Sequence, residues 1–583
     1  MTPPKSPIVE GAATAAFRAA RDQLVGWRGD PAAAAAGFAY PDVGARWNWA
    51  VDWFDRVARG VEREALVVID EDGTRTAVTF DEMADRSDRV ADWLRGLGIG
   101  VGDPVLVMLG NQVELWEVML GVMKVGAVIV PTTTAVGAAE LADRLERTSA
   151  RMVVCNEGDT GKFDAVPGDH LRVVVGSRPG WHGLDEAAAL PAREQPHPGT
   201  SPGDPLLLYF TSGTTSRPKL VQHTQASYPV GHLSTLYWLG IGPGDVHLNI
   251  SSPGWAKHAW SSFFAPWNAE STILVYNYAR FEAAPLLERL RSERVSSFCA
   301  PPTVWRMLIN ADLGDRPAAL RELIGAGEPL NPEVIGQVER RWGLTIRDGF
   351  GQTETTAQIG NAPGLPVKPG SMGKPLPGVP SVLLDPLTGS IVAAEGEGEI
   401  CLDLSAAPVS LMTGYLGDEE RNEEAMAGGF YHTGDVASRD ADGYITYVGR
   451  TDDVFKASDY KISPFELESV LIEHPAVAEA AVVPAPDPVR LAVPKAYVAL
   501  APGYEPGREV ALDILRHARE RLAPYLRVRR VEFHPLPKTI SGKIRRVELR
   551  SREQDLAGSG RTDGEWRDDD FPELKDGGAG AAR

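Results

Sequence analysis

The stretch PVLVMLGNQVELWEVMLGVMKVGAVIVP at residues 104–131 contains two short apolar runs separated by a segment of helix length. PVLVML and AVIVP have the length and composition of buried strands. Between them, four apolar residues recur at helical spacing: Val113, Trp116, Leu120 and Met123. This spacing places them on one face of a helix. A strand, a helix and a strand in this order predict a parallel β-α-β unit and therefore an α/β fold.

A second copy of this layout lies further along the chain. The phrase LGIGVGDPVLVML at 97–109 recurs as LGIGPGDVHLNI at 239–250, and in each copy glycine turns lead from a helix end into a strand. A dinucleotide-binding fingerprint needs the reverse order, a strand leading into a helix, so helix-capping turns are the favoured interpretation. The repeat predicts two similar α/β layered subdomains.

The pattern changes near residue 380. Short apolar runs separated by Gly, Pro and Asp, as in GEGEICLDL and DGYITYVGR, predict a small antiparallel or β-barrel section. After Arg450, alternating helix and strand patterns predict a small C-terminal α/β domain. We therefore expect a large N-terminal domain at 1–450, a C-terminal domain at 451–556, and a polar tail at 557–583 that is disordered in large part.

The charge and the cysteines exclude several kinds of partner and site. The 583 residues carry a formal net charge of −20, which disfavours binding to nucleic acid or to an anionic membrane surface. Cys155, Cys299 and Cys401 lie far apart with no CxxC spacing, so the sequence predicts neither a disulfide framework nor a zinc site, and Cys401 is interpreted as packing and not as a nucleophile. The longest apolar stretch, near Val118 to Pro131, is too short to span a bilayer, and the first residues lack the apolar core of a signal peptide. We expect a cytoplasmic protein with no membrane span.

The stretch YFTSGTTSRPK at 209–219 has the composition of a phosphate-binding loop. Backbone N–H groups freed by glycine, hydroxyl side chains and a lysine form a cradle for phosphate oxygens. The loop supplies all three from Thr211, Ser212, Gly213, Thr214, Thr215 and Lys219. The pattern GxxxxGK[ST] is absent, which disfavours a kinase or a P-loop ATPase. Taken alone, the stretch is equally compatible with a solvated surface turn.

Three further stretches carry polar groups suited to a nucleotide. GFGQTETT at 349–356 contains Glu354, a carboxylate suited to Mg²⁺, between two threonine hydroxyls. YHTGD at 431–435 places Asp435 at a turn, where a carboxylate can accept from two ribose hydroxyls. PKTISGKIRR at 537–546 puts Lys543 behind a glycine in a basic segment.

Together these stretches resemble the adenylate-forming superfamily of acyl-CoA synthetases, adenylation domains and luciferases. The matching elements, in the order of the family, are YFTSGTTSRPK, GAGEP (325–329), GFGQTET, GEI (398–400), YHTGD, GRTDD (449–453) and PKTISGK. The resemblance covers roughly residues 45–555. Three more stretches look most like the acetyl-CoA and medium-chain acyl-CoA synthetase branch: RWNWAVDWFD (46–55), SPGWAKHAW (252–260) and ISPFELESVLIEHPAVAEAAVVP (462–484).

The resemblance implies a role for each matching residue. The loop from Thr211 to Lys219 would hold the β- and γ-phosphates of ATP, with Glu354 on Mg²⁺ and Thr353 at the α-phosphate. The adenine would be lined by Gly325, Ala326, Gly327, Glu328 and Pro329, with Phe350 against its face, and Gln352 would also belong to the ATP site. Asp435 and Arg450 would bind the ribose, and Asp452 would be the hinge to a mobile C-terminal domain. Lys543 would reach the carboxylate and the α-phosphate during adenylation.

The reaction that the resemblance implies has two halves. A carboxylate attacks the α-phosphorus of ATP to give acyl-AMP and pyrophosphate, and the thiol of CoA then displaces AMP. ATP, Mg²⁺ and CoA are therefore the expected cofactor and co-substrates. In this family the small domain rotates between the halves, which accounts for a catalytic lysine, Lys543, on a domain separate from the ATP loop.

An acyl pocket and a CoA channel are expected along Trp255, Ala256, Gly351, Ser458 and Asp459. Acetate-specific members of the family have a tryptophan where Gly351 stands, so the glycine predicts a longer pocket. We expect a medium-chain fatty acid or a small aromatic acid to be favoured over acetate. Trp255 and the neighbouring His258 are also compatible with simple core packing.

Departures from the family pattern leave the acyl acceptor open. Asp459 stands where the family usually has glycine beside the pantetheine of CoA, and Lys461 where it usually has arginine. An adenylating enzyme that passes the acyl group to a carrier-protein thiol is therefore a second hypothesis, and a non-catalytic nucleotide-binding protein is a third. PKTISGK also resembles the segment that protein acetyltransferases recognise, so an acetyltransferase and a deacetylase acting on Lys543 are expected partners. The sequence does not predict the oligomeric state.

Overall fold

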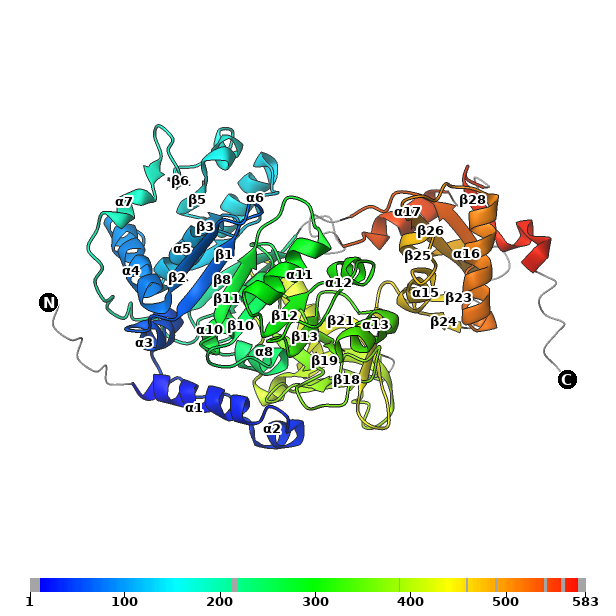
Figure 1. The fold of residues 1–583 in the computed structure, drawn as a ribbon, viewed down its shortest axis with the longest axis horizontal. Helices are drawn as coiled ribbons and strands as arrows, with labels where there is room; N and C mark the ends of the chain where they lie inside the picture. Colours follow the sequence, from blue (N-terminus) through cyan, green and yellow to red (C-terminus); the bar gives the residue numbers. More distant parts are fainter. Residues whose placement is uncertain are drawn as a thin grey trace.

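The computed structural model describes residues 11–211, 218–386, 388–457, 460–487, 491–538, 543–556 and 561–574. Figure 1 shows a large N-terminal lobe, coloured blue to yellow, beside a small C-terminal lobe, coloured orange to red. The predicted α/β class is therefore confirmed, with the larger part of the chain in the first lobe.

One large sheet contains the two strands of the opening stretch. Its order is β20–β9–β8–β4–β3–β5–β6–β7. The strands are β20 (Gly414–Tyr415), β9 (Lys219–Thr224), β8 (Pro205–Thr211), β4 (Val128–Pro131), β3 (Pro104–Met108), β5 (Met152–Asn156), β6 (Leu171–Val175) and β7 (His182–Gly183). β3 and β4 are parallel, with Val105 opposite Ile129, and α5 (Val113–Lys124) connects them. The predicted β-α-β unit is confirmed.

The second large sheet contains the repeated phrase. Its order is β14–β13–β12–β10–β11–β1–β2. The strands are β14 (Ile346–Arg347), β13 (Glu322–Gly325), β12 (Ser297–Ala300), β10 (Val246–Asn249), β11 (Thr272–Tyr276), β1 (Glu64–Ile69) and β2 (Arg75–Thr79). The glycines that precede β3 and β10 end helices in the left-handed conformation: Gly98, just after α4 (Phe80–Gly96), has φ 81°, and Gly240, after α8 (His232–Leu239), has φ 70°. Helix capping, and not dinucleotide binding, explains the repeat.

The predicted antiparallel section consists of two small open sheets. One has the order β18–β19–β21–β22, and the other has the order β15–β16–β17. The strands are β18 (Ser381–Leu384), β19 (Gly396–Asp403), β21 (Phe430–Arg439), β22 (Ile445–Arg450), β15 (Gly349–Gly351), β16 (Ala357–Gly360) and β17 (Lys374–Pro375). A bridge between Gly373 and Ile445 joins the two sheets, and a cluster that includes Ile359, Ile400 and Ile445 packs between them.

The C-terminal lobe is built on the sheet β25–β26–β27–β28. Its strands are β25 (Val477–Asp487), β26 (Leu491–Leu500), β27 (Arg530–Phe533) and β28 (Glu565–Arg567), and its helices are α15 (Pro464–Leu471), α16 (Arg508–Arg521) and α17 (Arg546–Asp555). A short hairpin of β23 (Phe455–Ala457) and β24 (Tyr460–Ile462) precedes them. A separate apolar cluster forms the core of this lobe.

The prediction of a largely disordered tail is wrong for residues 561–574. β28 pairs with β27, with Trp566 opposite Val531, and Phe571 and Leu574 are buried in the core of the C-terminal lobe. Because most residues of the tail are polar, its few apolar residues did not form a pattern that predicts an ordered segment. Residues 557–560 and 575–583 lie outside the described part of the chain.

No helix in the described ranges combines the length and the apolar character that a membrane crossing requires.

Candidate active site

The predicted phosphate loop connects β8 to β9. These strands form an antiparallel hairpin in which Thr211 lies opposite Lys219. Ser212, Gly213, Thr214 and Thr215, which were predicted to bind phosphate, lie outside the described residues. Of the predicted loop, the structure describes Thr211, Pro218 and Lys219.

Lys219 and Glu354 come together at one end of this hairpin. The Nζ atom of Lys219 lies 3.9 Å from Oε1 of Glu354, and Tyr415 bridges them. Lys219 donates to the Tyr415 hydroxyl at 3.1 Å, and that hydroxyl donates to Glu354 at 2.9 Å. Burial lowers the pKa of Lys219, and the Glu354 carboxylate opposes this shift. A cation and a carboxylate from two distant motifs thus share one polar site.

The donor set at Glu354 fits Mg²⁺. This ion uses one or two protein carboxylates and completes its octahedron with water and substrate phosphates. Glu354 provides one carboxylate, and the predicted phosphate loop ends next to it at Lys219. One protein carboxylate beside a predicted phosphate site fits the way in which proteins usually bind Mg²⁺.

A buried histidine that the sequence did not single out positions Thr353. Nε2 of His223 lies 2.7 Å from the Thr353 carbonyl, which can only accept, so the proton is on Nε2. Its Nδ1 faces the Ser227 hydroxyl at 3.0 Å. Burial lowers the pKa of His223 to about 3, so the ring is neutral near pH 7. His223 is in β9, and only the folded chain brings it to the QTET turn.

Asp435, Arg450 and Gln352, which come from three separate motifs, also meet. Gln352 donates to Oδ2 of Asp435 at 2.6 Å, and Nη1 of Arg450 lies 3.4 Å from the same oxygen. Tyr447 donates to the other oxygen at 3.2 Å. Burial raises the pKa of Asp435, and Arg450 opposes this shift. The result is a buried, hydrogen-bonded carboxylate beside the QTET turn.

The predicted adenine segment follows β13. Gly325 and Ala326 are buried, and the backbone of Gly327, Glu328 and Pro329 continues toward the surface. Asp348 fixes this segment to β15, because its carboxylate accepts from the N–H groups of Leu330 at 3.2 Å and Gly349 at 2.9 Å. Burial raises the pKa of Asp348 to about 7. Phe350, the next residue but one, is half-buried against the core between the small sheets.

Lys543 belongs to the C-terminal lobe but lies near the N-terminal site. Its charge acts on Asp435, where it adds to the effect of Arg450 in opposing the rise in pKa that burial causes. It also acts on Lys257: burial lowers the pKa of Lys257, and Lys543 lowers it further. The structure thus brings Lys543 into electrostatic range of Asp435 and Lys257.

The predicted hinge residue, Asp452, lies close to an arginine of each lobe. Asp452 is 3.6 Å from Nε of Arg450, at the end of β22, and 3.8 Å from Nη2 of Arg550, in α17. Its neighbour Asp453 pairs with Arg550 and lies 3.9 Å from Arg546.

Trp255 and Ala256 lie at the start of α9 (Ala256–Ala259). A small, mostly apolar cavity of about 10 Å³, roughly the space for one water molecule, is lined by Trp255, His258, Tyr209, Met119 and Val107 among others. His258 is buried and faces Oδ1 of Asn111 at 2.9 Å. Ser458 and Asp459, predicted for the same channel, lie outside the described residues.

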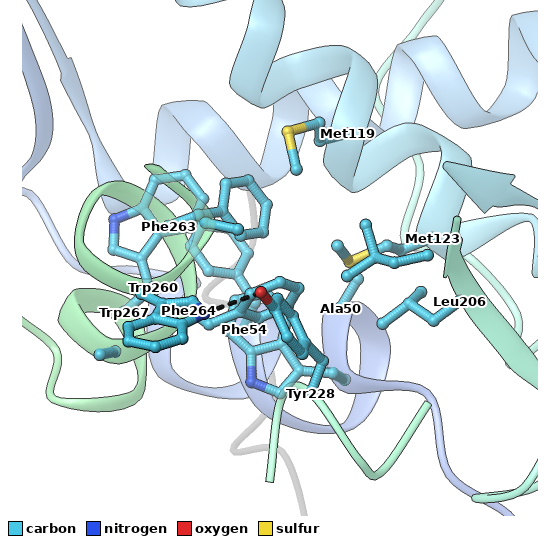
Figure 2. Close-up of a cluster of buried hydrophobic side chains, with 14 of the residues drawn as sticks. Ala50, Phe54, Met119, Met123, Leu206, Tyr228, Trp260, Phe263, Phe264 and Trp267 are labelled. Atoms are coloured by element: carbon cyan, nitrogen blue, oxygen red, sulfur yellow. Dashed lines mark hydrogen bonds between the residues drawn. The ribbon is translucent and has the colours of Figure 1, made fainter. Parts of the chain in front are cut away.

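The structure corrects the expectation that Gly351 leaves an open space. A Cβ atom on Gly351 would lie 2.4 Å from Cη2 of Trp260 and 2.4 Å from the Thr356 carbonyl oxygen. The indole of Trp260 therefore already occupies the place beside Gly351, and its Nε1 donates to the Tyr228 hydroxyl at 2.8 Å. Figure 2 shows Trp260 and Tyr228 within a cluster of buried aromatic side chains. The sequence did not reveal this, because Trp260 reaches the site from a distant segment.

Comparisons with known proteins agree with this arrangement. The profile of the AMP-binding enzyme family matches residues 53–416, and that of the AMP-binding enzyme C-terminal domain matches residues 466–543. The chain is 43% identical to 4-hydroxybutyrate–CoA ligase 1 of Metallosphaera sedula, over 88% of this chain and 91% of that protein. It is 36% identical to the mitochondrial acyl-coenzyme A synthetase ACSM3 of Mus musculus, over 87% of this chain and 90% of that protein.

A solved structure has the same fold over almost its whole length. The anthranilate CoA ligase AuaEII in complex with anthranoyl-AMP superposes with a TM-score of 0.79 at 28% identity, covering 88% of this chain and 99% of that one. The chain belongs to the AMP-binding enzyme family, in its acyl-CoA synthetase branch, and is an AMP-forming acid–CoA ligase that uses ATP, Mg²⁺ and CoA.

Proposed function

We propose that this ligase activates an acid larger than acetate: a hydroxy acid of about four carbons, a medium-chain fatty acid or an acid with one aromatic ring. The observation that carries the proposal is the lining of the region around Trp255 and Trp260, which is apolar and aromatic. The cavity beside Trp255 has room for about one water molecule, so an acid must displace lining side chains to enter it; each methylene then buried against this lining contributes about 0.8 kcal/mol, which favours longer acids over acetate. Two relatives named for their acids, 4-hydroxybutyrate and anthranilate, act on acids of this size.

We propose for these residues the roles that the family resemblance implies. Lys219 and the loop before it receive the pyrophosphate as it leaves, and Asp435 with Arg450 holds the ribose. The adenine lies along Gly325 to Pro329, with Phe350 on its face. Mg²⁺ bound at Glu354 would supply positive charge against the phosphate oxygens.

Adenylation joins two anions, so the protein must supply positive charge where they meet. We assign this task to Lys543, because its charge already acts on Asp435 and Lys257. The acid's carboxylate oxygen attacks the α-phosphorus, the bond to the β-phosphate oxygen breaks, and Lys543 offsets the charge on the carboxylate and the α-phosphate. We further propose domain boundaries at 1–450 and 451–556, with rotation about Asp452 before the thiol of CoA attacks the acyl-AMP.

A panel of acids tests the proposal. Purified enzyme is given acetate, 4-hydroxybutyrate, octanoate and benzoate, and AMP release is measured with and without CoA. We expect a higher kcat/KM for at least one of the three larger acids than for acetate, with AMP release dependent on CoA. A preference for acetate over all three contradicts the proposed acid. Turnover that requires a carrier protein in place of CoA selects the alternative acceptor.

We also propose a cytoplasmic location and control by acetylation. The three cysteines are free and buried, which is compatible with a reducing compartment. Lys543 is exposed, so an acetyltransferase can reach it, and acetylation would remove its charge. Adenylation should fall in protein shown by mass spectrometry to be acetylated at Lys543 and recover after deacetylation; unchanged adenylation would refute this regulation.

A further inference from the structure

Three potential metal ligands lie on one face of the small antiparallel sheet. Cys401 in β19 is directly opposite His432 in β21. Glu399 is two residues before Cys401 on the same strand, so its side chain emerges on the same face. None of the three belongs to the nucleotide contacts described above. Cysteine spacing could not predict this cluster, because its members come from segments about thirty residues apart.

The three ligand atoms are close to one another. Sγ of Cys401 lies 3.7 Å from Nδ1 of His432, and the same Nδ1 lies 2.8 Å from Oε2 of Glu399. All three atoms fall within 4.8 Å of each other. Cys401 is fully buried, whereas the side chains of Glu399 and His432 retain 14% and 30% exposure, so an ion can approach from their side.

The hydrogen bonds of His432 favour a positive charge between these three side chains. Nε2 of His432 lies 3.3 Å from the Ala427 carbonyl, which can only accept, so Nε2 carries a proton. In a neutral ring, Nδ1 then directs its lone pair at the Glu399 carboxylate and the Cys401 sulfur. A lone pair and a carboxylate repel each other unless a second proton or a metal ion lies between them. A backbone carbonyl on the far ring nitrogen is also a common partner of metal-bound histidine.

We propose that Glu399, Cys401 and His432 form a binding site for a divalent transition-metal ion, with Zn²⁺ as the best fit. Zn²⁺ accepts thiolate, imidazole and carboxylate ligands together in a tetrahedral set. With Zn–S of about 2.3 Å and Zn–N of about 2.05 Å, a tetrahedral ion sets the sulfur and nitrogen about 3.6 Å apart, close to the separation seen. The carboxylate must retreat from Nδ1 to about 3.4 Å, and water completes the fourth position.

Metal binding at this site should release protons, and the site adjoins the turn that carries Asp435. The Cys401 thiol loses its proton to solvent when the sulfur–metal bond forms, as does Nδ1 of His432 if it is protonated. Glu399 accepts from the Gly434 N–H at 2.9 Å, and Gly434 directly precedes Asp435. An ion held by Glu399 therefore lies directly behind the turn that carries Asp435.

Co²⁺ provides a direct test, because a thiolate ligand gives it a near-ultraviolet charge-transfer band. Full-length protein freed of metal is titrated with Co²⁺, and Zn²⁺ is then added in competition. We expect one equivalent of Co²⁺ to produce the band and one equivalent of Zn²⁺ to abolish it, while millimolar Mg²⁺ has no effect.

Variants assign the site. Cys401→Ala should abolish the band and weaken Zn²⁺ binding at least 100-fold, whereas Cys155→Ala, which removes another fully buried thiol, should leave both unchanged. His432→Gln keeps the thiol and should also lose tight binding, so a folding defect in one variant does not decide the result. Absence of a one-to-one thiolate band in the wild type, or its persistence in Cys401→Ala, would overturn the proposal.

Discussion

At the scale of single residues, loss of the Lys543 side chain should slow the first half-reaction, adenylation, much more than the second, thioester formation. Lys543→Ala removes positive charge from the proposed meeting point of carboxylate and α-phosphate, so adenylation should slow by on the order of 10²–10³. Formation of acyl-CoA from supplied acyl-AMP should be far less affected, because we assign it to the other lobe orientation. Pyrophosphate release and thioester formation are measured separately in single turnovers.

The matched control is Lys538→Ala. Lys538 belongs to the same PKTISGK stretch, but it pairs with Glu479 at 2.7 Å on the C-terminal lobe. This control should keep adenylation within about threefold of the wild type, since an exposed ion pair contributes at most about 1 kcal/mol. Equal losses in both half-reactions of Lys543→Ala contradict its assignment.

Trp260 should set the upper size of the acid. Its indole fills the place beside Gly351, where the resemblance had suggested open space. Trp260→Leu should therefore enlarge the pocket and raise kcat/KM for octanoate or decanoate relative to butyrate by about tenfold, close to 1.4 kcal/mol. The control is Trp93→Leu, which removes a tryptophan of similar burial in α4. An unchanged preference in Trp260→Leu would show that the acyl chain does not reach this indole.

Residues differ in how far sequence patterns identify them. Glu354, Asp435 and Lys543 stand in local motifs, so the sequence alone identifies them as candidate site residues. His223 and Trp260 carry no local signal, because each acts on a turn more than 80 positions away in the chain. Only the packed fold reveals that one orients Thr353 and the other takes the space that Gly351 leaves.

At the scale of elements, the docked tail should stabilise the C-terminal lobe. Phe571 is fully buried there, with Arg508 over its ring at 4.9 Å. Phe571→Ala should cost about 3–5 kcal/mol of the free energy of unfolding of this lobe, measured in urea. Tyr525→Ala removes an aromatic ring that is 48% exposed in the same lobe and should cost less than about 1 kcal/mol. Similar losses in both variants contradict docking of the tail.

A buried ion cluster explains why this tail segment returns to the sheet. Lys495 in β26 is buried and lies 2.7 Å from each of Glu532, Glu553 and Glu565, which come from β27, α17 and β28. An unpaired buried charge costs several kcal/mol, so each of these elements needs the others in place. Strand and helix periodicity predicted the two large sheets well, but a three-residue strand in a polar tail has too short a pattern to be recognised.

Buried histidines should make stability depend on pH. His247 in β10 faces Ser297 at 2.9 Å and Ser261 at 2.7 Å, and burial lowers its pKa to about 3. In the unfolded chain the imidazole of His247 takes up a proton near pH 6.5, whereas in the folded protein it does so only near pH 3. The free energy of unfolding is therefore unaffected by this group above about pH 6.5, and between these two pH values it falls by about 1.4 kcal/mol for each unit that the pH drops. When the pH is lowered from 7 to 5, the free energy of unfolding measured in urea should fall by about 2 kcal/mol less in His247→Gln than in the wild type. An equal loss in both proteins contradicts this account.

At the scale of the whole molecule, the lobes meet through contacts that the proposed rotation would have to break. Asn331 in the N-terminal lobe donates to the Ser469 carbonyl of the C-terminal lobe at 3.2 Å. Tyr447 packs edge-on against Phe465 at 5.8 Å between ring centroids. With Lys543 in range of Asp435, we infer that this orientation serves adenylation. Each polar or aromatic contact of this kind is weak enough for exchange with a second orientation.

A reversible crosslink across this interface tests the rotation. Asn331→Cys and Ser469→Cys are joined by a short bis-methanethiosulfonate reagent, which forms disulfides with accessible thiols and should spare the three buried native cysteines. The crosslinked enzyme should release one equivalent of pyrophosphate and retain acyl-AMP, because the adenylation orientation is fixed, while acyl-CoA formation should fall by at least tenfold. Reduction should restore CoA turnover, and each single-cysteine variant treated in the same way should behave as the wild type. Full CoA turnover by the crosslinked enzyme would mean that both half-reactions proceed in one orientation, and Lys543 would then have to act without withdrawing from the site.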